Sequence, residues 1–89
     1  MHVTLDTMVD TLKAAAESSR LRILTLLSRG DLTVSDLTEI LGQSQPRVSR
    51  HLKLLLEAGL IDRYQEGSWA FFRLSDADQE RGFVQGLVS

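Results

Sequence analysis

The chain has 89 residues, of which 43% are apolar and 25% charged, and its formal net charge is −2. A chain of this length forms one small domain with a modest core, and the absence of cysteine excludes disulfide bonds, thiolate metal ligands and a cysteine nucleophile. No apolar run approaches the ~18 residues of a membrane span, and residues 1–4 lack the basic start of a signal peptide, so we expect a cytoplasmic protein.

Apolar residues recur at helical spacing in the first part of the chain. This spacing predicts a first amphipathic helix over about residues 4–17. A second helix follows, capped by Ser18 or Ser19 and ended by Gly30, since serine favours helix starts and glycine the left-handed backbone after a helix. The apolar positions of the two helices are Leu5, Met8, Val9, Leu12, Ala15 and Ala16, and then Leu21, Leu24 and Leu27 flanked by Ile23 and Leu26.

A short extended segment at residues 31–33 leads into a third helix. Thr33 or Ser35 is placed to cap its start, and Asp36 or Glu39 to complete the cap. The apolar face that we expect it to bury consists of Val34, Leu37, Ile40 and Leu41.

Only about three residues around Gly42, which closes the third helix, separate it from a fourth. Ser44 is the expected N-cap, and Pro46 falls in the first turn, where a missing N–H costs nothing. The helix stops at residues 58–59. So short a joint sets two helices at a steep angle, which predicts a helix-turn-helix over about residues 33–58. The inward positions of the fourth helix are Val48, Leu52 and Leu55.

The period of the apolar residues then changes from about 3.6 to 2. The stretches LIDRYQ and SWAFFRL predict a hairpin with its turn at Glu66-Gly67, forming a wing over about residues 60–74. The tail of the chain, residues 75–89, is expected to form a short helix that Gly82 and Gly86 weaken. The fold class is therefore mainly α with a β-hairpin wing (α+β), a winged helix-turn-helix in one domain, 1–89, with the order α-α-(short β)-α-α-β-β-α.

The segment GQSQPRVSRHLKLL, residues 42–55, contains cations but no carboxylate, although the chain has 12 acidic residues. With the apolar stripe turned inward, guanidinium and amide groups point outward, where they can read base edges while other cations hold phosphates. For a DNA duplex, this local clustering matters more than the acidic total. The predicted DNA-binding surface comprises Gln45, Arg47, Ser49, Arg50 and Lys53 on the helix and Arg63, Gln65, Ser68 and Arg73 on the wing.

The stretch SQPRVSRHLKLLLEAGLIDRYQEGSWAFFRL resembles the signature of the arsenic-repressor (ArsR-type) winged-helix transcription regulators. In that signature a serine-rich start leads into V-S-x-H-L-x-x-L, then A-G-L-[IV], then a hairpin ending in an aromatic pair and R-L. The preceding stretch, LKAAAESSRLRILTLLSRGDLTVSDLTEILGQS, resembles the preceding part of the family. The resemblance implies a homodimeric repressor that joins through its first and last helices, binds inverted repeats in double-stranded DNA and leaves when an effector binds.

By position, the resemblance places Gln45, Pro46, Ser49 and Arg50 at major-groove contacts, with Arg47 beside them. His51 matches a recurrent histidine of the family, for which a hydrogen bond within the fold is at least as plausible as a DNA contact. The complete predicted DNA-binding set is Ser44, Gln45, Pro46, Arg47, Ser49, Arg50, His51, Lys53, Arg63, Gln65, Ser68 and Arg73. The predicted dimer interface is Leu5, Met8, Val9, Leu12, Phe83 and Leu87.

Metal-sensing members of the family carry ligands that this chain lacks. Cysteines of their third helix are replaced here by residues 33–35, Thr-Val-Ser, and Asp76, Asp78 and Glu80 near the last helix have no accompanying histidine. Most zinc sites need nitrogen or sulfur ligands. We therefore predict no metal ion and no cofactor, and leave a small-molecule effector open.

Two other hypotheses remain open. The chain also resembles the first part of longer members fused to a methyltransferase-like domain, so it can be the regulatory part of such a fusion. Alternatively, the wing and the fourth helix serve protein contacts, because Glu57, Asp62 and Glu66 would repel phosphate. Catalysis is not expected, since Ser49 and His51 are two positions apart on a helix and do not face each other.

Overall fold

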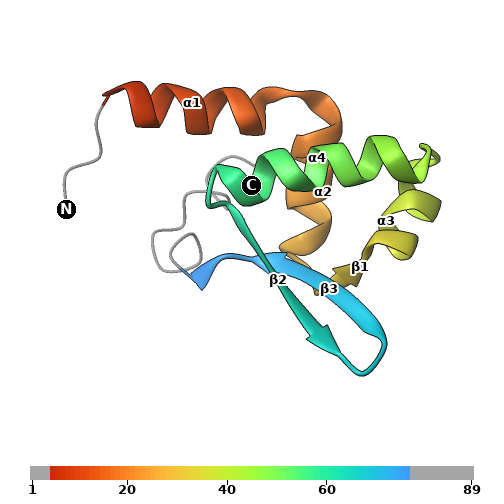
Figure 1. The fold of residues 1–89 in the computed structure, drawn as a ribbon. Coiled ribbons are helices and arrows are strands. Elements are labelled where there is room, and N and C mark those ends of the chain that lie inside the picture. The colour runs from red at the N-terminus through yellow and green to blue at the C-terminus, as the bar shows by residue number, and fades with distance from the viewer. Residues whose placement is uncertain (1–4, 77–89) are drawn as a thin grey trace.

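The structure, a computed structural model, describes residues 5–76. Four helices and three strands follow one another along the chain (Figure 1). In chain order they are α1 (Leu5–Ala16), α2 (Ser18–Leu27), β1 (Leu32–Thr33), α3 (Val34–Leu41), α4 (Gln45–Glu57), β2 (Ile61–Glu66) and β3 (Trp69–Leu74). The predicted fold class is confirmed. The predicted last helix lies almost wholly outside the described residues.

The three strands form one antiparallel sheet in the order β1-β3-β2. Glu66 pairs with Trp69, so the two-residue turn of the hairpin is Gly67-Ser68 rather than the predicted Glu66-Gly67. A turn of this kind needs a left-handed backbone, and Gly67 has a φ of 61°. The prediction was one residue early because glycine occupies the first turn position instead of the second.

One apolar core joins the helices to the sheet. It includes the predicted inward residues Val48, Leu52 and Leu55 of α4, and α2 crosses behind that helix (Figure 1). Ile40 was predicted to be buried, but its side chain is 47% exposed. Leu37 and Leu41 lie at the centre of the buried face of α3, and Ile40 falls at the edge of that face. The core residues are Ile23, Leu24, Leu27, Leu37, Leu41, Val48, Leu52, Leu55, Leu60, Ile61, Phe72 and Leu74.

The caps of α2 differ from the prediction. Its N-cap is Glu17, whose carboxylate accepts a hydrogen bond of 3.1 Å from the backbone N–H of Arg20. Ser18 and Ser19 lie inside the helix, whose first residue is Ser18, and the Ser19 hydroxyl accepts a hydrogen bond from the Gln43 amide. The helix ends at Leu27, before Gly30, and its C-cap Ser28 has a right-handed backbone, so the predicted left-handed glycine does not form this cap.

The start of α3 is a capping box, formed by Thr33 and Asp36, one of the alternatives that the sequence left open. The Thr33 hydroxyl accepts a hydrogen bond of 3.1 Å from the backbone N–H of Asp36. In return, the Asp36 carboxylate accepts one of 3.0 Å from the backbone N–H of Thr33. Thr33 also lies in β1, so this pair of bonds fixes α3 to the edge of the sheet.

We predict that Thr33→Ala lowers the free energy of unfolding by ~1 kcal/mol, within the range of about 0.5–2 found for lost caps. Urea denaturation followed by circular dichroism measures this change. Ser35→Ala, an exposed serine in the same helical turn, is the matched control and should change stability much less. Equal effects of the two substitutions would contradict the stabilising role of the cap.

Candidate nucleic-acid interface

The turn between α3 and α4 is held from two sides. Gly42, the C-cap of α3, has a φ of 67°, which lets the chain leave the helix abruptly. The side-chain amide of Gln43 donates a hydrogen bond of 2.8 Å to the Ser19 hydroxyl, which ties the turn to α2. Ser44 is the N-cap of α4, as predicted, although its hydroxyl makes no capping hydrogen bond, and Pro46 lies in the first turn.

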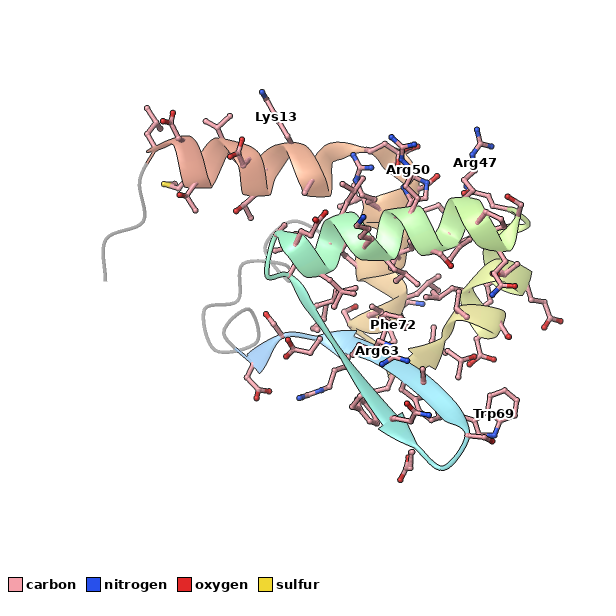
Figure 2. All side chains as sticks on the ribbon, viewed as in Figure 1. Lys13, Arg47, Arg50, Arg63, Trp69 and Phe72 are labelled. Atoms are coloured by element: carbon pink, nitrogen blue, oxygen red, sulfur yellow. The ribbon has the colours of Figure 1, made fainter. Side chains whose placement is uncertain are left out.

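The solvent-facing side of α4 carries the polar residues predicted to bind DNA. Since Val48, Leu52 and Leu55 are buried, residues on the opposite side of the helix point outward, and Ser49, Arg50 and Lys53 are exposed. Figure 2 shows Arg47 and Arg50 extending from α4 on the side away from the sheet. We call the exposed residues that precede Glu57 the α4 face, which consists of Gln45, Pro46, Arg47, Ser49, Arg50 and Lys53.

The hairpin separates its own charges onto two sides, because successive side chains of a strand point to opposite faces. Arg63 pairs with Phe72 and lines a pocket with residues of α4, so it lies on the helix side of the sheet. Gln65, two positions on, shares that side. Asp62 and Glu66 fall on the opposite side. The wing carboxylates that seemed to oppose DNA binding therefore face away from α4.

The structure does not bring Arg73 to this surface. Its register partner is Asp62, on the side of the hairpin away from α4, and its guanidinium lies 3.1 Å from the Asp76 carboxylate. Ser68 is exposed in the turn at the far end of the wing. Beside it stands Trp69, 59% exposed, which the sequence reasoning did not single out (Figure 2). The sequence feature that points to Trp69 is its position directly after the turn, at the outer end of β3.

His51 faces the junction of α1 and α2 rather than the solvent. Its side chain is only 13% exposed, and its Nδ1 lies 3.4 Å from Nη1 of Arg20 and 3.8 Å from a carboxylate oxygen of Glu17. Arg20 also donates through Nε to the backbone carbonyl of Ala14. The histidine therefore joins α4 to the first two helices, which favours the interpretation that it bonds within the fold.

The surroundings of His51 favour the neutral imidazole. Burial lowers the pKa of His51, the Glu17 carboxylate raises it, and the guanidinium groups of Arg20, Arg47 and Arg50 lower it, so that the pKa ends below its ordinary value of 6.5. A neutral ring can accept the hydrogen bond from Arg20 at Nδ1. Burial raises the pKa of Glu17, but hydrogen bonds from backbone N–H groups and the charges of His51 and Arg20 outweigh this and lower it.

The apolar side of α1 is open to solvent. Leu5, Met8, Val9 and Leu12 are all exposed in the isolated chain, with Leu5 at 74%. Phe83 and Leu87, predicted for the same interface, lie outside the described residues, as do Asp78 and Glu80. Within residues 5–76 there is no cluster of histidine and acidic side chains suited to a metal ion, and no helix is long and apolar enough to cross a membrane.

Comparison with known sequences shows that the chain is similar to a family of regulators. The profile of the family described as "Bacterial regulatory protein, arsR family" matches residues 17–63. The arsenical resistance operon repressor of Escherichia coli K12 is 47% identical over 68 residues, which cover 75% of this chain. They cover 58% of that repressor, so the chain spans less than two thirds of its relative's length.

Two solved structures have the same fold. HlyU from Vibrio cholerae superimposes with a TM-score of 0.83 at 32% identity, covering 98% of this chain and 94% of that one. The homodimeric winged helix-turn-helix DNA-binding domain of a possible ArsR-family transcriptional regulator from Mycobacterium bovis gives a TM-score of 0.83 at 31% identity. That match covers 94% of this chain and 78% of that one.

The environment of His51 predicts a pH-dependent stability. Because the pKa is lower in the folded protein than in the unfolded chain, the unfolded chain binds the proton more tightly. Stability is therefore fully present above the unfolded value of 6.5 and is lost as the pH falls through the folded value. Urea denaturation at pH values from about 8 to about 5 should show this loss in the wild type and a smaller one in His51→Gln.

The matched control is His2→Gln, which removes the other histidine of the chain and should keep the pH dependence of the wild type. A His51→Gln variant whose stability falls with acidification as steeply as that of the wild type would show that this histidine is not the titrating group.

Proposed function

The chain belongs to the bacterial arsR family of regulatory proteins, and from this premise we propose that it is a sequence-specific, DNA-binding transcriptional repressor. The observation that carries the proposal is the α4 face, where three cations and two neutral polar side chains lie opposite a fully buried apolar stripe. Its only neighbouring carboxylate on α4, Glu57, is at the C-terminal end of the helix. Such a face suits the major groove of a duplex.

The residues of the α4 face divide into two roles. Gln45 and Arg50 carry groups that can form paired hydrogen bonds to adenine and guanine edges, so we assign them to base recognition. Arg47, Ser49 and Lys53 are assigned to phosphates, with Ser44 and Pro46 at the approach of the helix N-terminus to the backbone. We assign His51 to positioning α4, because its ring contacts Arg20 and Glu17 instead of facing solvent.

The wing supplies a second, weaker contact. Arg63 lies on the α4 side of the hairpin, with Gln65 on the same side and Ser68 at the turn, so these residues can follow the backbone of the same duplex. Trp69 adds an exposed ring at the tip that can pack on a deoxyribose. Arg73 is left out of this contact, because it pairs with Asp76 on the other side.

The working unit that we propose is a homodimer joined through α1. Burial of Leu5, Met8, Val9 and Leu12 against a second copy would remove apolar side chains from water. The homodimeric Mycobacterium bovis domain supports this assembly by its similarity. Two α4 helices would then enter successive major grooves, ~34–36 Å apart, on an inverted repeat. We place the protein in the cytoplasm, where such a repressor meets DNA.

We assign no enzymatic activity to these residues. The relatives are regulators, and the polar side chains of the α4 face point outward from a convex helix instead of converging in a cleft. Of the three carboxylates that support the protein-contact alternative, Asp62 and Glu66 face away from α4, which leaves Glu57 at the end of that helix. Fusion to a methyltransferase-like domain stays a hypothesis about residues beyond this chain.

Selection of random duplex DNA by the purified protein, at ~0.15 M salt, tests both DNA binding and dimerisation. We expect enrichment of an inverted repeat with half-sites about one helical turn apart. Leu12→Glu should place a charge in the proposed α1 interface, yield a monomer in analytical ultracentrifugation and enrich a single half-site. Enrichment of no sequence by the wild type would overturn the proposed function.

Substitutions on the selected site separate base contacts from phosphate contacts. Gln45→Ala and Arg50→Ala should each cost ~1–3 kcal/mol and relax the preference at particular base positions. Lys53→Ala and Arg63→Ala should weaken binding to all sequences and lower the salt slope by about one. Arg29→Ala, an exposed cation just beyond α2, is the control. Competition binding against single-base variants of the site, repeated at several salt concentrations, measures both effects.

A further inference from the structure

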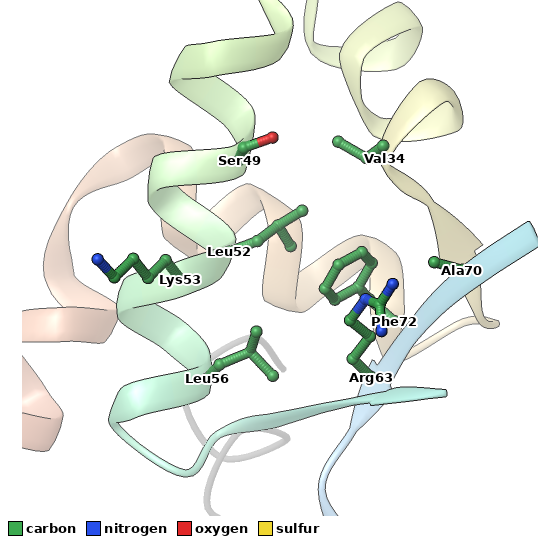
Figure 3. Close-up of a pocket in the computed structure, with 8 residues that line it drawn as sticks. All are labelled: Val34, Ser49, Leu52, Lys53, Leu56, Arg63, Ala70 and Phe72. Carbon is green, nitrogen blue, oxygen red and sulfur yellow. The ribbon is translucent and has the colours of Figure 1, made fainter. Parts of the chain in front are cut away.

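A pocket of about 220 Å³ lies between α4, the start of α3 and the hairpin (Figure 3). Its walls are mainly apolar. Leu52 and Phe72 are buried at its base, and three half-buried side chains complete it: Val34, Leu56 and Ala70. Two exposed polar groups stand at the edge, the hydroxyl of Ser49 and the guanidinium of Arg63, and the stem of Lys53 closes one side.

The charge at this pocket is positive and uncompensated. Within residues 5–76 the Arg73 guanidinium pairs with the Asp76 carboxylate and the Glu17 carboxylate lies beside His51, whereas no carboxylate lies within ion-pair distance of Arg63. Figure 3 shows its guanidinium beside the ring of Phe72, its partner across the strands, while the Lys53 ammonium extends away from the pocket. A guanidinium at the edge of an apolar pocket matches a ligand that has an apolar body and one carboxylate.

The volume of the pocket indicates how large an apolar group it can cover. Drug-sized ligands occupy pockets of ~300–1,000 Å³, whereas an apolar cavity of ~150 Å³ is enough for benzene. A volume of 220 Å³ therefore suits one ring or a short branched chain with a small polar group. The exposed residues at the edge leave the pocket open to solvent, so such a ligand can enter without unfolding the protein.

We propose that this pocket binds a small amphipathic carboxylate, with the apolar body against Leu52, Leu56 and Phe72 and the carboxylate on Arg63. The inference that this ligand is the effector rests on the proposed function. Arg63, Ser49 and Lys53 are also assigned to the DNA backbone, so the carboxylate would occupy the place of a phosphate. Ligand and DNA then exclude each other, and by linkage each lowers the affinity for the other.

The first test measures ligand binding to the dimer without DNA. The probe is 3-phenylpropionate, titrated into ¹⁵N-labelled protein while amide shifts are recorded. We expect saturable shifts at Leu56, Ala70 and Phe72. The neutral analogue 3-phenylpropanol should bind about two- to fivefold more weakly, because it cannot form an ion pair with the exposed Arg63 guanidinium. Acetate, which lacks the apolar body, should not saturate over the same concentrations.

Variants locate the site. Ala70→Leu fills the pocket and should abolish saturable binding, with Leu56→Phe as the second filling variant if the first does not fold. Arg63→Gln should weaken 3-phenylpropionate but leave 3-phenylpropanol unchanged. Arg29→Gln, a cation outside the pocket, should bind both probes as the wild type does. Unchanged binding in a folded filling variant overturns the site, and so do equal shifts with inorganic phosphate, which would mark a general phosphate site.

The second test adds 3-phenylpropionate to the protein bound to its selected DNA site. Release of DNA from the wild type but not from a folded filling variant supports the effector role, and saturable binding without release overturns it. Failure of the protein to bind any DNA would instead overturn the proposed function. The shift titration remains readable in that case, because it contains no DNA.

Discussion

Burial of one side of α4 is the constraint on which the rest of the structure depends. Val48, Leu52 and Leu55 are withdrawn from water against α2, α3 and the sheet, and each buried side chain of this kind is worth ~1.5–3 kcal/mol. That burial fixes the rotation of the helix about its axis. The cations Arg47, Arg50 and Lys53 are thereby turned outward, so the core itself orients the surface that we assign to DNA.

The alternation of side chains between the two faces of the hairpin fixes which wing residues face α4. Ile61 and Leu74 are buried on the helix side of the sheet, and this sets the register in which Arg63 shares their side and Asp62 and Glu66 do not. A slip of one residue would exchange the two sets and turn carboxylates toward α4. The same apolar pairs that stabilise the hairpin thereby determine the sign of the wing charges beside α4.

The sequence was sufficient wherever a period or a steric demand decided the structure. The stripe of α4, the capping box at Thr33 and the left-handed Gly42 followed from local rules. It failed where neighbouring side chains can cap the same helix end: Glu17 rather than Ser18 or Ser19 caps α2, and the Ser19 hydroxyl bonds instead with Gln43, distant in sequence. The separation of Arg73 from Arg63 required the strand register, and the pocket required the packing of α3 and α4 on the hairpin.

The contacts of His51 connect the two surfaces that the proposed repressor would use. Arg20 lies 3.4 Å from the His51 ring on α4 and also donates to the carbonyl of Ala14 near the end of α1. The helix that would carry the dimer interface is therefore linked through one guanidinium to the helix that would read DNA. Because a neutral ring accepts from Arg20 whereas a protonated ring would repel it, that link is strongest when His51 is uncharged. Burial lowers the pKa of His51 and thereby keeps the ring neutral at neutral pH. A buried histidine at this position therefore connects α4 to Arg20 better than an exposed one would.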